Sequence, residues 1–435
     1  MITETFDIVI LGGGIAGVAA AVKAGRAGVR VLLLERYPFI GGMATAGMVS
    51  PFMKYTTAGT VLVRGVFQEL QERMRDRQGM QENGFRADAF RFAARQLLQE
   101  AGVQVWTRCE LISVQRRDRQ IESLEALHAA TPRRISGRVF IDTSGDAQLV
   151  HLADLPTVAG REGSGESQEL TLFFRMAGID FEPVLKQVRR QPQDFFDWVD
   201  AEPNEDGIVS IAGFFSLIKA AHAAGTLSTD IDYIFFNSLP AAGEASFNTT
   251  AVSHLSANSS AQLTRAERLA NAQVHQVVDL LRDQVDGFQN AILLETATQI
   301  GVRESRRIVG DVTISGADIR SGRHVPDAVA RGCYGVDIHG SGDSEDVMED
   351  LAEGIWYEVP QGSLIARDSD NLLAAGRCLS ADFEAHGALR IMPTAAATGE
   401  ACGAWAALAI QNECPLRRVS NEELQALIQT NLAKN

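Results

Sequence analysis

The sequence predicts an α/β protein built on a parallel sheet, and three observations support this. A short apolar run, Ile8–Leu11, leads directly into a glycine cluster and then into an alanine-rich segment over residues 15–27. A second apolar run, Val29–Leu34, ends in Glu35, and a third, residues 371–375, ends in Gly-Arg. Apolar strands that alternate with helical segments are typical of α/β folds. We therefore expect the first and last parts of the chain to share one α/β domain.

The glycine cluster has the spacing G-x-G-x-x-G, at Gly12, Gly14 and Gly17. The first glycine permits a sharp turn, the second permits a pyrophosphate to approach the backbone, and the third permits close packing of the helix on the sheet. The N-terminus of the helix then directs free N–H groups toward the phosphates. Glu35 ends the next strand, where a ribose hydroxyl would lie. The pattern predicts a dinucleotide site without specifying the dinucleotide.

The 435-residue chain has an ordinary globular composition, with 46% hydrophobic and 22% charged residues. Its net charge of −15 argues against nucleic-acid binding, which needs a basic surface. No apolar stretch has transmembrane length and no basic segment precedes the first apolar run, so neither a membrane span nor a signal peptide is expected. The five cysteines form no C-x-x-C pair, so we expect no metal site, no thiol redox pair and a cytoplasmic location.

The pattern of elements divides the chain into three parts. Residues 1–165 and 295–435 are expected to form a discontinuous dinucleotide-binding domain, and residues 166–294 an inserted α+β substrate domain without a second glycine-rich loop. Expected helices lie at 65–78, 86–101, 181–190, 212–224, 264–285, 395–410 and 420–432. Further expected strands lie at 103–106, 109–115, 121–128, 134–141, 170–176, 233–239 and 334–339.

Several motifs together carry a family resemblance. They are Gly12–Gly17 with Glu35, Gly41–Thr45, Ile141–Asp146, Gly301–Arg307, Asn371–Arg377 and His386–Pro393. With them the chain resembles the FAD-dependent oxidoreductases of the glutathione-reductase-like superfamily, and more narrowly the branch similar to flavoprotein subunits of fumarate reductase. The resemblance covers nearly the whole chain and implies a Rossmann-like FAD-binding domain. An enzyme that binds only NAD has no reason to carry the C-terminal motifs.

The resemblance also implies a set of cofactor contacts. They are Gly12, Gly13, Gly14, Ala16 and Gly17 at the pyrophosphate; Glu35 and Arg36 at the adenosine ribose; Gly42, Met43 and Ala44 along the pyrophosphate and flavin; Glu110 or Leu111 at the adenine; Ser144, Gly145 and Asp146 at the border of the cofactor; Gly376 and Arg377 at the ribityl chain and phosphate; and Pro393 and Thr394 at the start of a helix aimed at the flavin. No histidine stands beside Met43 and Ala44 to carry a covalent flavin bond, so noncovalent FAD is expected.

His386 and Arg390 are the first candidates for chemistry. We expect His386 in a turn between the flavin-binding strand and helix, where a histidine serves as acid or base near neutral pH. The alternative is that it only forms a hydrogen bond with the backbone. Arg390 is expected to anchor a substrate carboxylate or to contact the flavin, and the alternative is an ion pair with Glu384.

Two further groups are candidates. Arg303, Arg306 and Arg307 are expected to clamp an anionic substrate, or alternatively to pair with acidic neighbours. Asp337 and His339 alternate along one strand face and form either an acid–base pair or a structural pair.

The leading hypothesis is an enzyme that transfers a hydride between noncovalent FAD and a small organic substrate with an anionic or hydroxylated group. Dehydrogenation, oxidase activity and reduction of an activated double bond all remain open, as does electron supply by a redox partner or by NAD(P)H. The alternative is a flavin-containing electron-transfer or binding subunit without its own substrate, because an acidic surface suits docking to a basic partner. A monomer and a homodimer are equally compatible with the sequence.

Overall fold

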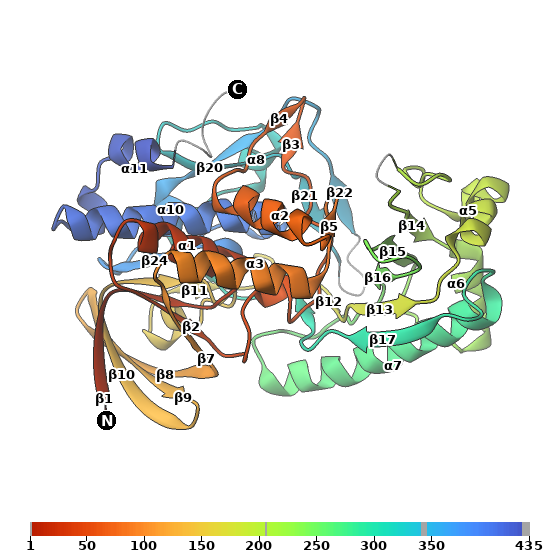
Figure 1. Ribbon diagram of the computed structural model, residues 1–435, viewed down its shortest axis with the longest axis horizontal. Coiled ribbons are helices and arrows are strands. Elements are labelled where there is room, and N and C mark those ends of the chain that lie inside the picture. Colours follow the sequence, from red (N-terminus) through yellow and green to blue (C-terminus); the bar gives the residue numbers. More distant parts are fainter. Residues whose placement is uncertain (1, 205–206, 341–345, 429–435) are drawn as a thin grey trace.

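The computed structural model describes residues 2–204, 207–340 and 346–428, and its largest sheet confirms the α/β class (Figure 1). Strands run in the order β7, β2, β1, β10, β9 and β8, and β24 also pairs with β10. Pairing is parallel from β7 through β10 and on to β24, and antiparallel for β9 and β8. The strands are β1 (Ile2–Leu11), β2 (Val31–Glu35), β7 (Gln104–Thr107), β8 (Cys109–Arg117), β9 (Gln120–His128), β10 (Thr131–Asp142) and β24 (Leu372–Ala374).

Both faces of this sheet are covered, which explains why its strands read as continuous apolar runs. Side chains of β1 alternate, so that Ile8 and Ile10 join the core beneath the helices while Val9 and Leu11 join a second core on the opposite face. The helices of this part are α1 (Ile15–Arg26), α2 (Val66–Asp76), α3 (Ala87–Glu100), α4 (Gln148–Leu152), α10 (Met392–Gln411) and α11 (Asn421–Leu427).

Helix α10 lies directly against α1, although nearly the whole chain separates them (Figure 1). A Cβ atom at Gly399 would overlap the carbonyl of Ala16, and one at Gly403 would overlap the carbonyl of Ala20. The glycines of α10 therefore permit a backbone approach that any larger residue would prevent. The C-terminal segment is thereby brought onto the first strand–turn–helix unit.

The segment from Phe174 to Thr296, called the inserted region below, carries its own antiparallel sheet, in the order β14, β15, β16, β13 and β17. Its core is rich in phenylalanine, and the rings of Phe174 and Phe247 stack at 4.7 Å between centroids. In Figure 1 this region lies on the right, away from the largest sheet. Its elements are β13 (Phe174–Ala177), α5 (Phe181–Arg190), β14 (Ser210–Gly213), α6 (Phe215–Ala224), β15 (Ile234–Ser238), β16 (Ala245–Phe247), α7 (Ser260–Gln284) and β17 (Ile292–Thr296).

Short elements connect these layers. They are β3 (Thr56–Thr57), β4 (Thr60–Val61), β5 (Met80–Gln81), β6 (Gly84–Phe85), β11 (Thr157–Val158), β12 (Leu170–Thr171), β18 (Gly301–Val302), β19 (Arg307–Ile308), α8 (Gly316–Arg320), β20 (Ala328–Gly332), β21 (Val336–Ile338), β22 (Val347–Glu349), β23 (Tyr357–Pro360) and α9 (Phe383–Leu389).

Two expected helices differ from the structure. The helix expected over 212–224 begins at Phe215, because Ser210–Gly213 pairs with β15 as a strand and Phe214 adopts a left-handed conformation between them. The C-terminal helix ends at Leu427, and residues 429–432 of the expected span lie outside the described residues. Among the helices that the structure describes, none is long and apolar enough to cross a membrane.

Candidate active site

The glycine turn after β1 forms a tight backbone cradle. Gly12 has φ +102°, and a Cβ atom there would lie 2.5 Å from the carbonyl oxygen of Thr143. A Cβ atom at Gly17 would overlap the carbonyl oxygen of Gly12. Helix α1 has Gly14 as its N-cap and no side chain caps it, so its first N–H groups remain available to an anion. This is the arrangement that a pyrophosphate requires.

Residues 41–44 lie against this turn. The Gly41 N–H donates to the carbonyl of Gly13 at 2.7 Å, and a short 3₁₀ turn follows at Gly42–Ala44. Met43 is half-buried and Ala44 is buried. The second predicted segment thus borders the glycine cradle.

Glu35 lies at the same edge of the sheet and is 5% exposed. Its carboxylate accepts N–H bonds from Gly13 and Tyr37, both at 2.8 Å, and burial raises its pKa. Arg36 is exposed and donates to Gln299 at 2.9 Å. Leu111 is buried in β8, where it pairs with Ala126 in the ladder, and its predicted contact with adenine remains a prediction.

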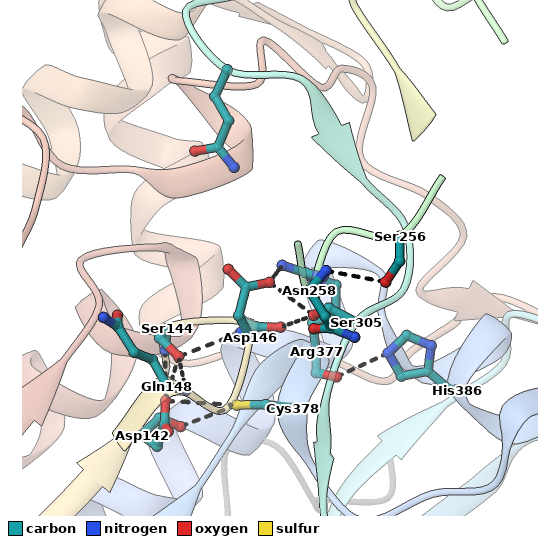
Figure 2. A network of polar contacts seen from close by, with 12 residues as sticks. Asp142, Ser144, Asp146, Gln148, Ser256, Asn258, Ser305, Arg377, Cys378 and His386 are labelled. Carbon is teal, nitrogen blue, oxygen red and sulfur yellow. Dashed lines mark hydrogen bonds and ion pairs between the residues drawn. The ribbon is translucent and has the colours of Figure 1, made fainter. Parts of the chain in front are cut away.

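A polar network joins the turn after β10 to the turn after β24 (Figure 2). Arg377 Nη2 donates to Asp146 Oδ1 at 2.7 Å, and Arg377 Nη1 donates to Ser305 Oγ at 2.9 Å. Burial raises the pKa of Asp146, but the Arg377 charge and the Ser305 hydrogen bond outweigh it and hold the pKa below its usual value. Ser144 donates to Asp142 at 2.6 Å. The structure thus brings Ser144, Asp146 and Arg377 together.

The sequence reasoning missed Ser305 in this network. The signal was present, because Ser305 lies inside the arginine-rich segment 303–307. The arginines of this segment were the predicted substrate contacts, whereas the Ser305 hydroxyl is the group that donates to Asp146, at 2.8 Å.

His386 lies in helix α9 and not in a turn, which corrects the expectation. The N-cap of α9 is Asp382, whose side chain accepts the Ala385 N–H at 2.7 Å. The helix therefore begins at Phe383, before His386. His386 is 1% exposed, and its Nε2 donates to the carbonyl of Arg377 at 2.9 Å (Figure 2). Burial, together with nearby arginines, lowers its pKa well below the usual value. His386 is therefore a neutral group that holds the Arg377 turn.

Helix α10 supplies a second uncapped N-terminus. Its N-cap is Ile391, and no side chain caps the following turn, which contains Pro393 and Thr394. The Gly376 N–H donates to Thr398 Oγ1 at 3.1 Å, and a Cβ atom at Gly376 would lie 3.0 Å from Ala16 Cβ. The N-termini of α1 and α10 thus lie close to the glycine turns at residues 12–14, 41–42 and 376. Their free N–H groups suit a cofactor that carries a pyrophosphate and a ring able to bear negative charge.

A cavity of about 540 Å³ lies where the inserted region meets the C-terminal part. This volume is in the usual range for small-molecule sites. Its lining includes Arg303 and His339, both of which lie partly exposed, and side chains of the inserted region. The full lining is Glu169, Phe196, Phe215, Asp230, Asp232, Tyr233, Asn248, Thr249, Thr250, Ala251, Arg303, His339, Gly340 and Asp346.

A chain of polar contacts leads from this cavity to α10. His339 Nε2 lies 3.3 Å from Asp337 Oδ1, and Asp337 Oδ2 accepts from Tyr334 at 2.8 Å and from Arg390 at 3.0 Å. Arg390 directly precedes Ile391, the N-cap of α10. The predicted pair of Asp337 and His339 is therefore present, and Arg390 links it to the N-terminus of α10.

The charges around Asp337 set its ionisation and that of His339. Burial lowers the pKa of His339 to about 3, and the Arg303 charge acts in the same direction. Burial raises the pKa of Asp337, but the Arg390 charge and the hydrogen bond from Tyr334 lower it, so that the carboxylate stays ionised. At neutral pH the site therefore presents an uncharged imidazole backed by a carboxylate.

Arg390 pairs with Asp337 and not with Glu384, which corrects the alternative expectation. Glu384 instead accepts from Arg320 at 2.7 Å. The six-residue separation between Arg390 and Glu384 spans the end of α9, and the Arg390 side chain turns toward β21 instead.

The three arginines of segment 303–307 do not act together. Arg303 lines the cavity, and its Nη1 donates to the carbonyl of Glu169 at 3.0 Å. Arg306 is half-buried and has no hydrogen bond or ion pair within the part of the chain that the structure describes. Arg307 is fully buried and donates to Glu304 at 2.8 Å. The structure therefore presents one of the three to the cavity.

The buried pair of Glu304 and Arg307 gives a stability prediction. Glu304→Gln is expected to lower the free energy of unfolding by about 3–5 kcal/mol, because it removes the buried counterion of Arg307 and leaves only the more distant, exposed carboxylate of Glu162. Glu162→Gln is the matched control, since this carboxylate lies 3.9 Å from the same Arg307 but its side chain is 65% exposed. Denaturant unfolding of both variants checks the prediction, and equal stabilities would contradict it.

The family model described as FAD dependent oxidoreductase matches residues 7–428. No curated protein sequence matches the chain. Similar solved structures include a geranylgeranyl bacteriochlorophyll reductase-like protein from Thermoplasma acidophilum (13% identity, 99% of this chain and 86% of that chain, TM-score 0.51) and the flavin-dependent brominase Bmp2 (12%, 98% and 83%, 0.51). A third is p-nitrophenol 4-monooxygenase PnpA from Pseudomonas putida DLL-E4 (11%, 99% and 84%, 0.51). At these identities the likeness is one of fold.

Proposed function

Because the chain belongs to the FAD-dependent oxidoreductase family, we propose that it transfers a hydride between noncovalently bound FAD and a small organic substrate held in the 540 Å³ cavity. The protein is thus an FAD-dependent enzyme, and the substrate and the hydride step are the proposal. The observation that supports it is the run of contacts from His339 through Asp337 and Arg390 to the N-terminus of α10. This run joins the cavity to the helix that is predicted to face the flavin.

The residues of the cradle fit FAD. The glycines of the turn after β1 and the N-terminus of α1 would hold the pyrophosphate, with Glu35 toward the ribose. Arg377, Asp146 and Ser305 would line the ribityl side, where His386 holds the backbone turn. When bound, FAD supplies the hydride chemistry, and the protein supplies orientation and proton handling. The uncapped start of α10 would stabilise negative charge on the ring.

We assign proton handling to His339 rather than to His386. Asp337 Oδ1 has no hydrogen-bond partner other than the nearby His339 Nε2 within the described residues, so this nitrogen is assigned the proton. Nδ1 is then the atom that would take a proton from substrate. Because the His339 pKa is low, the imidazolium would be a transient species, which the Asp337 carboxylate would stabilise. His386 is buried and bound to a backbone carbonyl, so its role is to position the Arg377 turn.

The direction of the reaction and the electron partner belong to the proposal. Dehydrogenation, oxidase activity and the reduction of a double bond by a fumarate-reductase-type reaction all use the same arrangement. A cytoplasmic monomer or homodimer, with a redox partner or NAD(P)H as electron source, is the setting we expect. The second candidate is a flavoprotein subunit without its own substrate, which the net charge of −15 favours through docking to a basic partner.

The visible absorption spectrum before and after acid precipitation is the first test. We expect flavin bands that move to the supernatant, because the cradle contains no histidine beside Met43 and Ala44. Anaerobic addition of candidate substrates is then expected to bleach the bands. A flavin that a protein partner reduces, but that no small molecule bleaches, would support the electron-transfer subunit instead.

A further inference from the structure

The cavity wall has an unequal charge balance. The residues that line it include four with carboxylates, Glu169, Asp230, Asp232 and Asp346, but only one arginine, Arg303, and an uncharged imidazole. Asp230, Asp232 and Asp346 are exposed to solvent at the mouth of the cavity. Arg303 lies beside Glu169, to whose carbonyl it donates at 3.0 Å. Within the described residues Asp230 and Asp232 form no ion pair, and Asp346 has no cationic partner and lies 3.7 Å from Nδ1 of the uncharged His339.

Two of these carboxylates, Glu169 and Asp232, have raised pKa values, and burial is the largest cause in both. Burial raises the pKa of Glu169, and the charges of Asp346 and Asp230 add to the effect. Burial and Asp346 likewise raise the pKa of Asp232. A positive charge in the cavity would relieve this repulsion.

The same cavity has an aromatic wall from the inserted region. The ring of Phe196 meets Phe215 at 5.1 Å and Tyr233 at 5.2 Å, both edge to face. Aromatic faces attract cations and pack flat apolar groups. The wall therefore favours a ligand that combines an apolar body with a positive group.

We infer that the cavity binds an organic cation, namely a primary amine in its ammonium form that carries a flat apolar body. This inference rests on the proposed function, because it takes the cavity as the substrate site. It replaces the sequence expectation of an anionic group clamped by arginines. A metal cation is a poorer fit, since no His, Cys, Asp and Glu side chains of the described residues group closely enough to hold one.

Three probes of the same shape test the charge preference. Benzylamine, benzyl alcohol and benzoate are titrated into the protein as purified, at about pH 7.5, where the amine is protonated, and binding is measured by calorimetry. We expect benzylamine to bind at least about tenfold more tightly than either other probe, and added salt to weaken it. Tightest binding of benzoate, equal binding of all three, or binding of none would overturn the inference.

Two variants locate the effect. Asp232→Asn is expected to weaken benzylamine binding about three- to tenfold and to leave benzyl alcohol unchanged. Asp283→Asn is the matched control, because this carboxylate is exposed on α7 and does not line the cavity. An equal loss in both variants would show a general charge effect and contradict the inference.

The binding measurement does not depend on turnover, so the two proposals fail separately. If benzylamine binds but no amine bleaches the flavin, the cation site would be supported and the proposed reaction would be contradicted. Bleaching by neutral or anionic compounds without amine binding would retain the reaction and remove the cation site.

Discussion

His339→Ala is expected to slow substrate-dependent bleaching of the flavin by about 10²–10⁴-fold, with FAD content unchanged. The reason is that His339 is the uncharged imidazole on the cavity wall, backed by Asp337 at 3.3 Å. The side chain belongs to the rim of the cavity and not to the glycine cradle, so cofactor binding should survive its removal. Anaerobic stopped-flow absorbance, with the flavin-to-protein ratio measured beside it, checks this result.

Two other histidine variants serve as comparisons for His339→Ala. His324→Ala removes an exposed ring that packs on Trp356 outside the cavity, and it should leave both quantities unchanged. His386→Ala leaves the Arg377 carbonyl without its donor, so it should reduce FAD content while molecules that retain FAD react within a few-fold of the normal rate. If His386→Ala reacted slowly with full FAD content while His339→Ala reacted at the normal rate, proton transfer would have to be assigned to His386 instead.

Gly17→Ala is expected to weaken FAD binding at least about tenfold, or by about 1.4 kcal/mol or more. Alanine ordinarily favours a helix over glycine by about 1 kcal/mol, so propensity alone predicts a more stable protein. At this position, however, the added Cβ would overlap the Gly12 carbonyl and lie 2.6 Å from Thr143 Oγ1. Either the turn or the helix must then move, and the N–H groups aimed at the pyrophosphate move with it.

Gly84→Ala is the matched control for this variant. A Cβ atom there would have only ordinary contacts, at 3.6 Å from the Gln81 carbonyl oxygen and 3.8 Å from that of Ser238. The flavin-to-protein ratio after gel filtration and the dissociation constant of added FAD measure both variants. Full FAD retention by Gly17→Ala would mean that the turn does not hold the pyrophosphate.

Much of the candidate cofactor site could be predicted from local sequence. The turn at Gly12–Gly17 admits only glycine at positions where a Cβ atom would overlap backbone, so the requirement is written in neighbouring residues. The position of Glu35 could also be predicted locally, because Glu35 ends the strand that pairs in parallel with β1. Gly399 and Gly403 of α10 permit a close approach to another element, and the structure identifies that element as α1.

The catalytic candidates could not be ranked in this way. His386 and His339 both lie close to recognisable sequence motifs, and a motif does not show whether a side chain is buried. The cap at Asp382 starts a helix that buries His386 against Arg377, whereas His339 follows β21 and lies on the cavity wall. Only the packing of α9 and β21 separates the two.

Local sequence was enough to predict the α/β class, the glycine turn after β1 and the family resemblance, because each depends on short-range spacing along a strand, turn or helix. The tertiary structure decided the cavity and its charge. Arg303 and the Glu169 carbonyl that it contacts are 134 residues apart, and Asp232 joins them from a third segment. Electrostatic balance in a cavity depends on distance in space, and no pattern along the chain reports it.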